Sequence, residues 1–221
     1  MDFLDTILSL VFPIKCAICG KAGLDFCSRC LEDCPRAERE SAKWIFPLYD
    51  YRHPPIKKSL WLFKYKGKRR LAKIFAEILY ENMLEELADL AVLENFNNTL
   101  LVPIPLSRKR LRERGYNQAA LICREILKIN IAQENSGVKF ELSENALVKP
   151  KETEHQAHIK DRKRRMENMR GTFQVDNPAI VAGRNIILID DILTTGATLS
   201  EARRTLKDAG ARKVIAFTLA H

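Results

Sequence analysis

The sequence lacks any hydrophobic run close to the roughly 18–20 residues that a membrane-spanning helix needs. Its longest candidate, Phe3 to Phe12, is interrupted by Asp5 and stopped by Pro13, and no basic residue precedes the apolar part, so we expect no secretory signal. Glycine and proline number only nine each among 221 residues, which excludes fibrous proteins, and 46% apolar residues exclude a disordered chain. We therefore expect a soluble, cytoplasmic protein with one medium domain, alone or with a small appendage.

Acidic residues are too few to balance the basic ones. The chain contains 37 Lys and Arg against 28 Asp and Glu, a net charge of +9, and residues 101–172 alone contain 16 basic and 9 acidic side chains. Concentrated positive charge attracts phosphate groups, on a nucleotide-like ligand or on nucleic acid. A solvated basic face that only aids solubility is the alternative.

Cysteine is nearly absent outside one short segment, because five of the six cysteines lie within residues 16–34. Two Cys-x-x-Cys pairs separated by seven residues place four thiolates on tight turns, which suits tetrahedral zinc. The predicted zinc ligands are Cys16, Cys19, Cys27 and Cys30. A redox pair or plain disulfides are the alternatives, and Cys34 could replace Cys30 as a ligand. We expect Cys123 to be an ordinary buried thiol.

The order of secondary-structure signals predicts an α/β fold. The expected strands cover residues 44–51, 100–102, 186–189 and 214–219, and the expected helices residues 3–11, 71–90, 111–126 and 199–209, the last followed by Gly210. The continuous apolar run 186–189 is typical of a parallel strand covered on both faces, and the final strand, helix and strand predict a right-handed βαβ unit. Residues 149–170 are expected to form a mobile loop or hairpin. We divide the chain into a zinc-knuckle module, 1–43, and a domain, 44–221.

The strongest signal for a binding site follows the apolar run 186–189. Asp190 and Asp191 put two carboxylates at the carboxyl end of a buried strand, where α/β sheets bind ligands. The turn Thr194–Thr198 follows at a helix start whose backbone N–H groups can bind phosphate, and Gly196 allows close approach. Together these groups suit a sugar with vicinal hydroxyls and a 5′-phosphate, and no Gly-Lys-Ser/Thr triplet marks a Walker loop. The alternative is an ordinary strand end with two solvated acids; in either case we expect Thr198 to cap the helix.

The stretch Ile187–Leu199 resembles the signature with which type I phosphoribosyltransferases bind 5-phosphoribosyl pyrophosphate (PRPP). With the cysteine pairs upstream, the chain resembles the ComF family of bacterial proteins (ComFC- or GntX-like), which combine a double zinc knuckle with such a domain. Val102–Gln118 matches the central motif of that family. Its later loop motif is matched by Thr153–Gln156, Arg165, Asn168 and Gly171–Phe173.

The resemblance implies a type I phosphoribosyltransferase-like parallel sheet flanked by helices, with a small N-terminal zinc-binding module of four cysteines. It implies that the two acids face the ribose hydroxyls of PRPP, that the turn holds the 5′-phosphate, and that Mg²⁺ bridges pyrophosphate to ribose. The implied PRPP-binding residues are Asp190, Asp191, Thr194, Thr195, Gly196, Ala197 and Thr198. The loop 102–107 would lie by the pyrophosphate, and the segment 149–170 would close over the site. Arg110 and Arg114, four apart on a predicted helix, and Arg165 are candidate contacts for pyrophosphate or nucleic acid; for the first two a plain basic surface pair is the alternative.

The resemblance also implies a role in natural transformation, through uptake or processing of single-stranded DNA, with a helicase-like protein and a DNA-protecting protein as partners. One hypothesis is a phosphoribosyltransferase that acts on an unidentified acceptor. The other is a non-catalytic PRPP-type fold that serves ligand sensing, nucleic-acid contact or partner docking. No base-recognition motif identifies the acceptor, and in the basic region only Tyr116 and Phe173 are candidate stacking platforms for a single strand.

Overall fold

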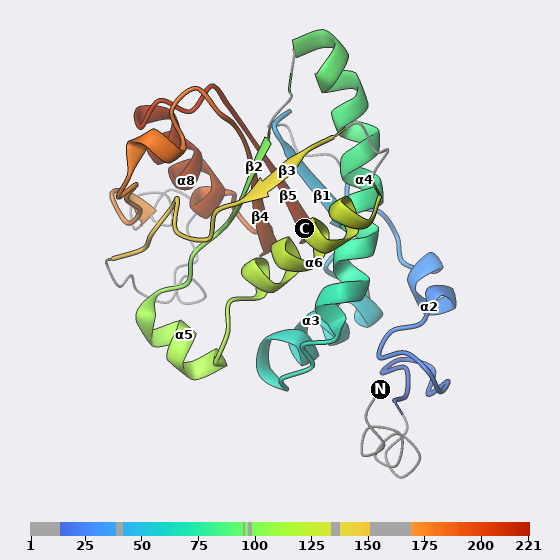
Figure 1. Ribbon diagram of the computed structural model, residues 1–221. Helices are drawn as coiled ribbons and strands as arrows, with labels where there is room; N and C mark the ends of the chain where they lie inside the picture. Colours follow the sequence, from blue (N-terminus) through green and yellow to red (C-terminus); the bar gives the residue numbers. More distant parts are fainter. Residues whose placement is uncertain (1–13, 39–41, 95, 97–98, 134–137, 151–168) are drawn as a thin grey trace.

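The computed structural model describes residues 14–38, 42–94, 96, 99–133, 138–150 and 169–221. Five parallel strands form one sheet in the order β1-β5-β4-β2-β3, with helices packed against it (Figure 1). The predicted α/β fold is thereby confirmed. Within the described ranges, no helix is both long and apolar enough to span a membrane.

The strands are β1 (Ile45–Tyr49), β2 (Thr99–Pro103), β3 (Phe140–Leu142), β4 (Asn185–Ile192) and β5 (Lys213–Ala220). Four of them lie where the apolar runs predicted strands. The exception is β3, which has only three residues and follows β2 at the edge of the sheet. A strand this short carries too few side chains for its alternation to be recognised.

The helices are α2 (Ser28–Glu32), α3 (Pro54–Tyr65), α4 (Leu71–Glu94), α5 (Arg108–Arg114), α6 (Gln118–Ala132) and α8 (Ala197–Asp208), with a short 3₁₀ helix η2 (Pro178–Ile180). The predictions of α4 and α8 are confirmed, and Gly210, with φ of +93°, follows α8 as expected. The expected helix 3–11 and most of the expected loop 149–170 lie outside the described residues.

Helix α3 was not among the helices predicted from the sequence. This helix begins with Pro54 and Pro55, which lie in its first turn, where the missing N–H of proline breaks no helical hydrogen bond. We expected the pair only to end the preceding strand. The signal that predicts a helix there is the proline pair followed by Ile56, Leu60 and Phe63 at helical spacing, all of which are buried.

The single helix expected over residues 111–126 is wrong, because the chain forms two helices there. Gly115 adopts φ of +75°, a left-handed conformation that ends α5. Asn117 then caps α6, since its side-chain oxygen accepts hydrogen bonds from the backbone N–H groups two and three residues later. Gly115, which ends one helix, and Asn117, which starts the next, therefore outweigh the apolar periodicity that runs through both helices.

The sheet carries a core on each face. Ile187 and Ile189 of β4 point into one core and Ile186 and Leu188 into the other, and none of the four is exposed. This two-sided burial explains the continuous apolar run in the sequence. The first core also contains Phe26 and the buried cysteines of the N-terminal segment, so the segments 1–43 and 44–221 contribute side chains to the same core.

Candidate functional site

The carboxyl ends of β4 and β2 lie side by side and direct two loops to the same edge of the sheet. Pro103, the last residue of β2, pairs with Ile189 of β4, and the N–H of Ile104 donates to the Ile189 carbonyl at 2.9 Å. The loop that follows β2 therefore starts beside Asp190 and Asp191, which stand near the end of β4. This arrangement puts the residues after both strands at one site.

Asp191 lies in a largely buried ion-pair network. Lys64, near the end of α3, places its Nζ 2.8 Å from Asp191 Oδ1, and Arg114 of α5 places Nη1 4.0 Å from Oδ2. All three side chains are only 12–13% exposed. The alternative of two solvated acids is therefore wrong for Asp191, because folding brings the side chains of Lys64 and Arg114 to the end of β4.

The surroundings of Asp190 disfavour a negative charge on its side chain. Burial, together with the negative charge of Asp191, raises the pKa of Asp190 to about 7. The N–H of Asp191, which donates to Asp190 Oδ1 at 2.8 Å, and the charges of Lys64 and Arg114 only partly offset this rise. At neutral pH Asp190 therefore takes up a proton readily, whereas Asp191 is the acid that pairs with Lys64 and Arg114.

The turn after the acid pair leads into α8 and carries unpaired donors. Gly196, with φ of +74°, precedes the first helical residue, and no side chain among the described residues caps the helix, so the expected capping by Thr198 is wrong. The first N–H with a helical acceptor is that of Ser200, which leaves the N–H groups of residues 197–199 without one. Thr195 Oγ1 is also buried and has no hydrogen-bond partner within the described part of the chain. Unpaired N–H groups and a hydroxyl at a helix start suit an oxyanion such as phosphate.

The predicted arginines are placed differently from one another. Arg114 points to the site, and its Nη1 donates to Gln118 Oε1 at 2.8 Å, across the break between α5 and α6. Arg110 is half-buried in the middle of α5, where its N–H donates to the N-capping hydroxyl of Ser107. Arg165 lies outside the described residues.

Lys64, the closer of the two ion-pair partners of Asp191, was not among the residues predicted from the sequence. Its partner is 127 positions away in the sequence, so no local pattern links the two residues. The one signal that could have drawn attention to it is the basic and aromatic run Lys64–Arg70, which lies outside the basic region singled out above.

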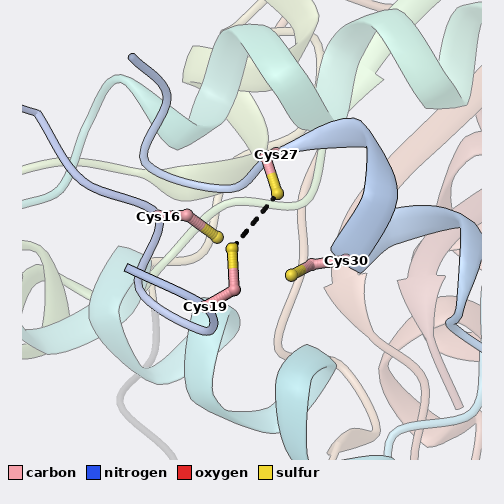
Figure 2. Close-up of side chains that lie close together, drawn as sticks. All are labelled: Cys16, Cys19, Cys27 and Cys30. Carbon is pink, nitrogen blue, oxygen red and sulfur yellow. Dashed lines mark hydrogen bonds between the residues drawn. The ribbon is translucent and has the colours of Figure 1, made fainter. Parts of the chain in front are cut away.

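A second candidate site lies in the N-terminal segment. Figure 2 shows Cys16, Cys19, Cys27 and Cys30 pointing toward one another, and all four sulfurs lie within 4.8 Å of each other. The sulfurs of Cys19 and Cys27 are 3.6 Å apart, and about 3.8 Å is the separation expected in a tetrahedral zinc–thiolate centre with Zn–S bonds of about 2.3 Å. The predicted four-cysteine set is brought together, and its geometry is compatible with a metal site.

The thiols of this cluster differ in acidity. Burial raises the pKa of Cys16, but the N–H groups of Cys19, Cys27 and Ile18 outweigh it and lower the pKa to about 6. Burial and the three neighbouring thiols raise the pKa of Cys30 to about 12. N–H groups that stabilise a thiolate favour the form that binds a metal cation, and a bound cation would reverse the rise at Cys30.

The other two cysteines stand apart from the cluster. Cys34 donates its thiol to the carbonyl of Cys30 at 3.1 Å, so the described cluster contains Cys30 rather than Cys34. Burial raises the pKa of Cys34 to about 11 and that of Cys123 well above its usual range. Cys123 is fully buried, as expected, and all six cysteines are free thiols.

Comparisons with known proteins found a matching domain model and relatives that cover most of the chain. Residues 139–221 match the family model described as phosphoribosyl transferase domain. DNA utilization protein YhgH of Escherichia coli (strain K12) is 26% identical over 193 residues, which cover 87% of this chain and 76% of the relative. Competence protein ComFC of Bacillus subtilis is 33% identical over 165 residues, 74% of this chain and 59% of the relative. Competence protein ComFC of Streptococcus pneumoniae is 28% identical over 217 residues, 97% and 84% of the two chains.

The chain belongs to the ComFC/YhgH family. Its parallel sheet has a phosphoribosyltransferase-like fold, and the four-cysteine cluster precedes this fold in the chain, so the resemblance stated from the motifs is confirmed.

Proposed function

We propose that this member of the ComFC/YhgH family binds PRPP, or a similar ribose phosphate, at Asp190, Asp191 and the turn 194–198. One observation carries the proposal: two acids whose carboxyl oxygens can accept hydrogen bonds stand just before a turn with unpaired donors. Carboxylates accept from the hydroxyls of a sugar, and N–H groups and a hydroxyl bind phosphate. A ribose 5-phosphate moiety satisfies both sets at once.

In this proposal the acids, the turn and the arginines each bind a different part of the ligand. Asp191 and its neighbour Asp190 orient the ribose through its 2′- and 3′-hydroxyls, and the turn fixes the 5′-phosphate. Arg114, and Arg110 on the same helix, would neutralise a departing pyrophosphate near the loop 102–107. Mg²⁺ bound with the ligand supplies further neutralisation of the pyrophosphate charge. The reaction class is phosphoribosyl transfer to an acceptor that is not identified.

The four cysteines would hold one zinc ion. Four thiolates complete a tetrahedral shell and leave no position for water or substrate, which is the pattern of a structural rather than a catalytic zinc site. The N–H groups that lower the pKa of Cys16 favour such a centre, because they stabilise thiolate charge that a divalent cation only partly cancels. We therefore propose that zinc stabilises the fold and takes no part in the transfer.

The cellular role follows from the relatives. Their names describe competence proteins and DNA utilization proteins, and we propose that this chain acts in the same process, the uptake or use of DNA in the cytoplasm. A helicase-like protein and a DNA-protecting protein are the partners proposed with that role.

Thr195→Val tests the phosphate part of the site, because valine keeps the shape of threonine and removes only the hydroxyl. We expect the affinity for PRPP with Mg²⁺, measured by titration calorimetry, to fall roughly tenfold, since a hydrogen bond to a charged group contributes about 1.5 kcal/mol. Ribose without phosphate should show no difference between the variant and the wild type. Equal PRPP affinity in the two proteins would reject the turn as the phosphate site, and pyrophosphate release over candidate acceptors tests catalysis separately.

A further inference from the structure

The excess positive charge of the chain lies on two segments that meet at the site. Residues 54–70, which form α3 and the loop after it, and residues 108–116, which form α5 and its end, contain twelve basic residues and one acidic residue. The remaining 195 residues have a net charge of −2. We call the surface of these two segments the α3–α5 face; Figure 1 shows α3 and α5 at the same end of the molecule.

Two large aromatic side chains are exposed on this face. Trp61 is 47% exposed and Tyr65 is 59% exposed, whereas Ile56, Leu60 and Phe63 anchor the opposite side of α3 in the core. The exposed residues follow one another at a spacing of four, so they lie on one stripe of the helix. Lys57, one turn earlier, continues the stripe and is exposed as well. Exposed tryptophan and tyrosine in a stripe are a recognition feature rather than part of the core.

A cation accompanies each aromatic ring. Lys66 Nζ lies 5.2 Å from the centre of the Trp61 ring, and the Arg114 guanidinium lies 5.4 Å from the centre of the Tyr65 ring. A planar base that stacks on such a ring leaves its phosphate within reach of the adjacent cation. The pairing of flat apolar surface with single positive charges therefore fits a chain of alternating bases and phosphates.

We infer that the α3–α5 face binds single-stranded nucleic acid, with bases stacked on Trp61 and Tyr65 and phosphates on the lysines and arginines around them. Duplex DNA offers the same phosphates, but its bases are paired and stacked on each other, so they cannot use the rings. This surface differs from the basic segment 149–170. Its exposed rings are those of Trp61 and Tyr65, whereas Tyr116 is buried and donates to the carbonyl of Phe63.

The face leads directly to the acid pair. Tyr65 contacts Arg114, and Arg114 in turn lies beside Asp191. A strand that follows the face to its end therefore reaches the site assigned above to PRPP, and this part of the inference rests on the proposed function. We expect PRPP with Mg²⁺ to compete with a strand that carries a 5′-phosphate.

Fluorescence anisotropy of a labelled oligothymidylate of about 20 nucleotides tests the inference on the full chain. Trp61→Ala should weaken binding at least fivefold, because stacking one base on an aromatic ring contributes about 1–3 kcal/mol. The matched control Ile131→Ala, which truncates a 68% exposed side chain on α6, should leave binding unchanged. In a Trp44→Phe background, the remaining fluorescence of Trp61 should be quenched by the oligonucleotide, which a purely structural role of Trp61 would not produce.

The charges are tested by the salt dependence of binding. Lys57→Gln with Lys66→Gln should flatten the log–log slope by about 0.7 for each lost phosphate contact. Lys128→Gln with Lys207→Gln removes the same charge from α6 and α8 and should leave the slope unchanged. Unaltered binding in Trp61→Ala, or equal loss in both charge variants, would overturn the inference.

Two further outcomes separate this inference from its alternatives. If Trp61→Ala weakened the binding of a duplex, or of phosphatidylserine vesicles, as much as it weakens the binding of the oligothymidylate, a single strand would be rejected as the ligand. Trp61→Ala should keep the wild-type affinity for PRPP, so a failure of PRPP to bind at all would contradict the proposed function without touching the stacking result. A strand that PRPP does not displace would contradict the part of the inference that leads it to the acid pair.

Discussion

Asp190 and Asp191 are neighbours in sequence but differ in what their charges do to the fold. The pKa of Asp190 is raised to about 7 from 3.8, so its ionisation opposes folding. The penalty is absent below about pH 4, grows as the pH rises through about 7, and is complete above it. Asp190→Asn should therefore raise the free energy of unfolding by on the order of 1–2 kcal/mol at pH 8 and leave it unchanged near pH 4. Urea unfolding at the two pH values measures this; a stabilisation independent of pH would contradict the assigned environment.

The ion pair between Lys64 and Asp191 predicts a second stability effect, of opposite sign. Lys64→Met should lower the free energy of unfolding by about 2 kcal/mol, because it leaves a largely buried carboxylate with only the more distant Arg114. Asp191→Asn should cost a similar amount, and the double variant much less than the sum of the two. Lys128→Met is the matched control, since the Lys128–Glu125 pair is as short, at 2.7 Å, but the lysine is 70% exposed. The control should change stability by less than about 0.5 kcal/mol, and additive costs for Lys64 and Asp191 would argue against the pair.

The acids of the site could be predicted from the sequence, whereas their electrostatic partners could not. Asp190 and Asp191 follow an apolar run and precede a Thr-Gly turn, so local order alone reveals them. Lys64 meets Asp191 only in the folded chain, and such a contact between distant positions leaves no mark in either local sequence. The unpaired hydroxyl of Thr195 likewise becomes visible only when its surroundings are known.

At the scale of elements, the sequence predicted what apolar periodicity can reveal and missed what single turn residues decide. Four strands and the helices α4 and α8 followed from the pattern of buried side chains. The division of α5 from α6 depends on Gly115, and the start of α8 on Gly196, where the left-handed backbone replaces the expected cap by Thr198. A single glycine or capping residue can end or start a helix although the apolar pattern continues through it, so such residues must be considered before the bounds of a helix are predicted.

Gly115 provides the test at this scale. Gly115→Ala should lower the free energy of unfolding by about 1 kcal/mol or more, because a side chain at φ of +75° is strained, although the added Cβ would meet only Arg69 at an ordinary 3.7 Å. Gly115→Asn should cost less, since asparagine tolerates the left-handed region. Thermal unfolding of both variants measures these changes in stability. Equal stability of Gly115→Ala and the wild type would show that the break between α5 and α6 needs no glycine.

At the scale of the whole molecule, the cysteine cluster and the sheet are parts of one packed structure. Phe26 lies in the same core as Phe75 of α4, and Lys68 places its Nζ 3.2 Å from Asp25. Loss of a metal from the cluster should therefore loosen the contacts of the first core as well as the knuckles. A domain boundary near residue 43 remains a prediction about folding units, while the packing joins the two segments.

Metal content tests this picture. The purified chain should contain about one zinc per molecule, and Cys30→Ser should lose it while Cys34→Ser keeps it, because only Cys30 belongs to the cluster. Chelation of the zinc should lower the thermal midpoint of the entire chain in a single transition. Elemental analysis of anaerobically purified protein and calorimetry provide the measurements. Metal-free wild-type protein of full stability would refute the zinc site.

The central claim is that the acid pair and the turn after it bind the ribose phosphate of PRPP, and titration calorimetry of PRPP with Mg²⁺ tests it most directly. The wild-type chain should bind at one site. At pH 8, where Asp190 is mostly ionised, Asp190→Asn should lower the affinity at least about tenfold, because it removes a charge-assisted hydrogen bond of about 1.5–3 kcal/mol without unfolding the chain. Asp176→Asn, which neutralises an exposed acid elsewhere, should bind like the wild type. An unchanged affinity for PRPP in folded Asp190→Asn would contradict the account.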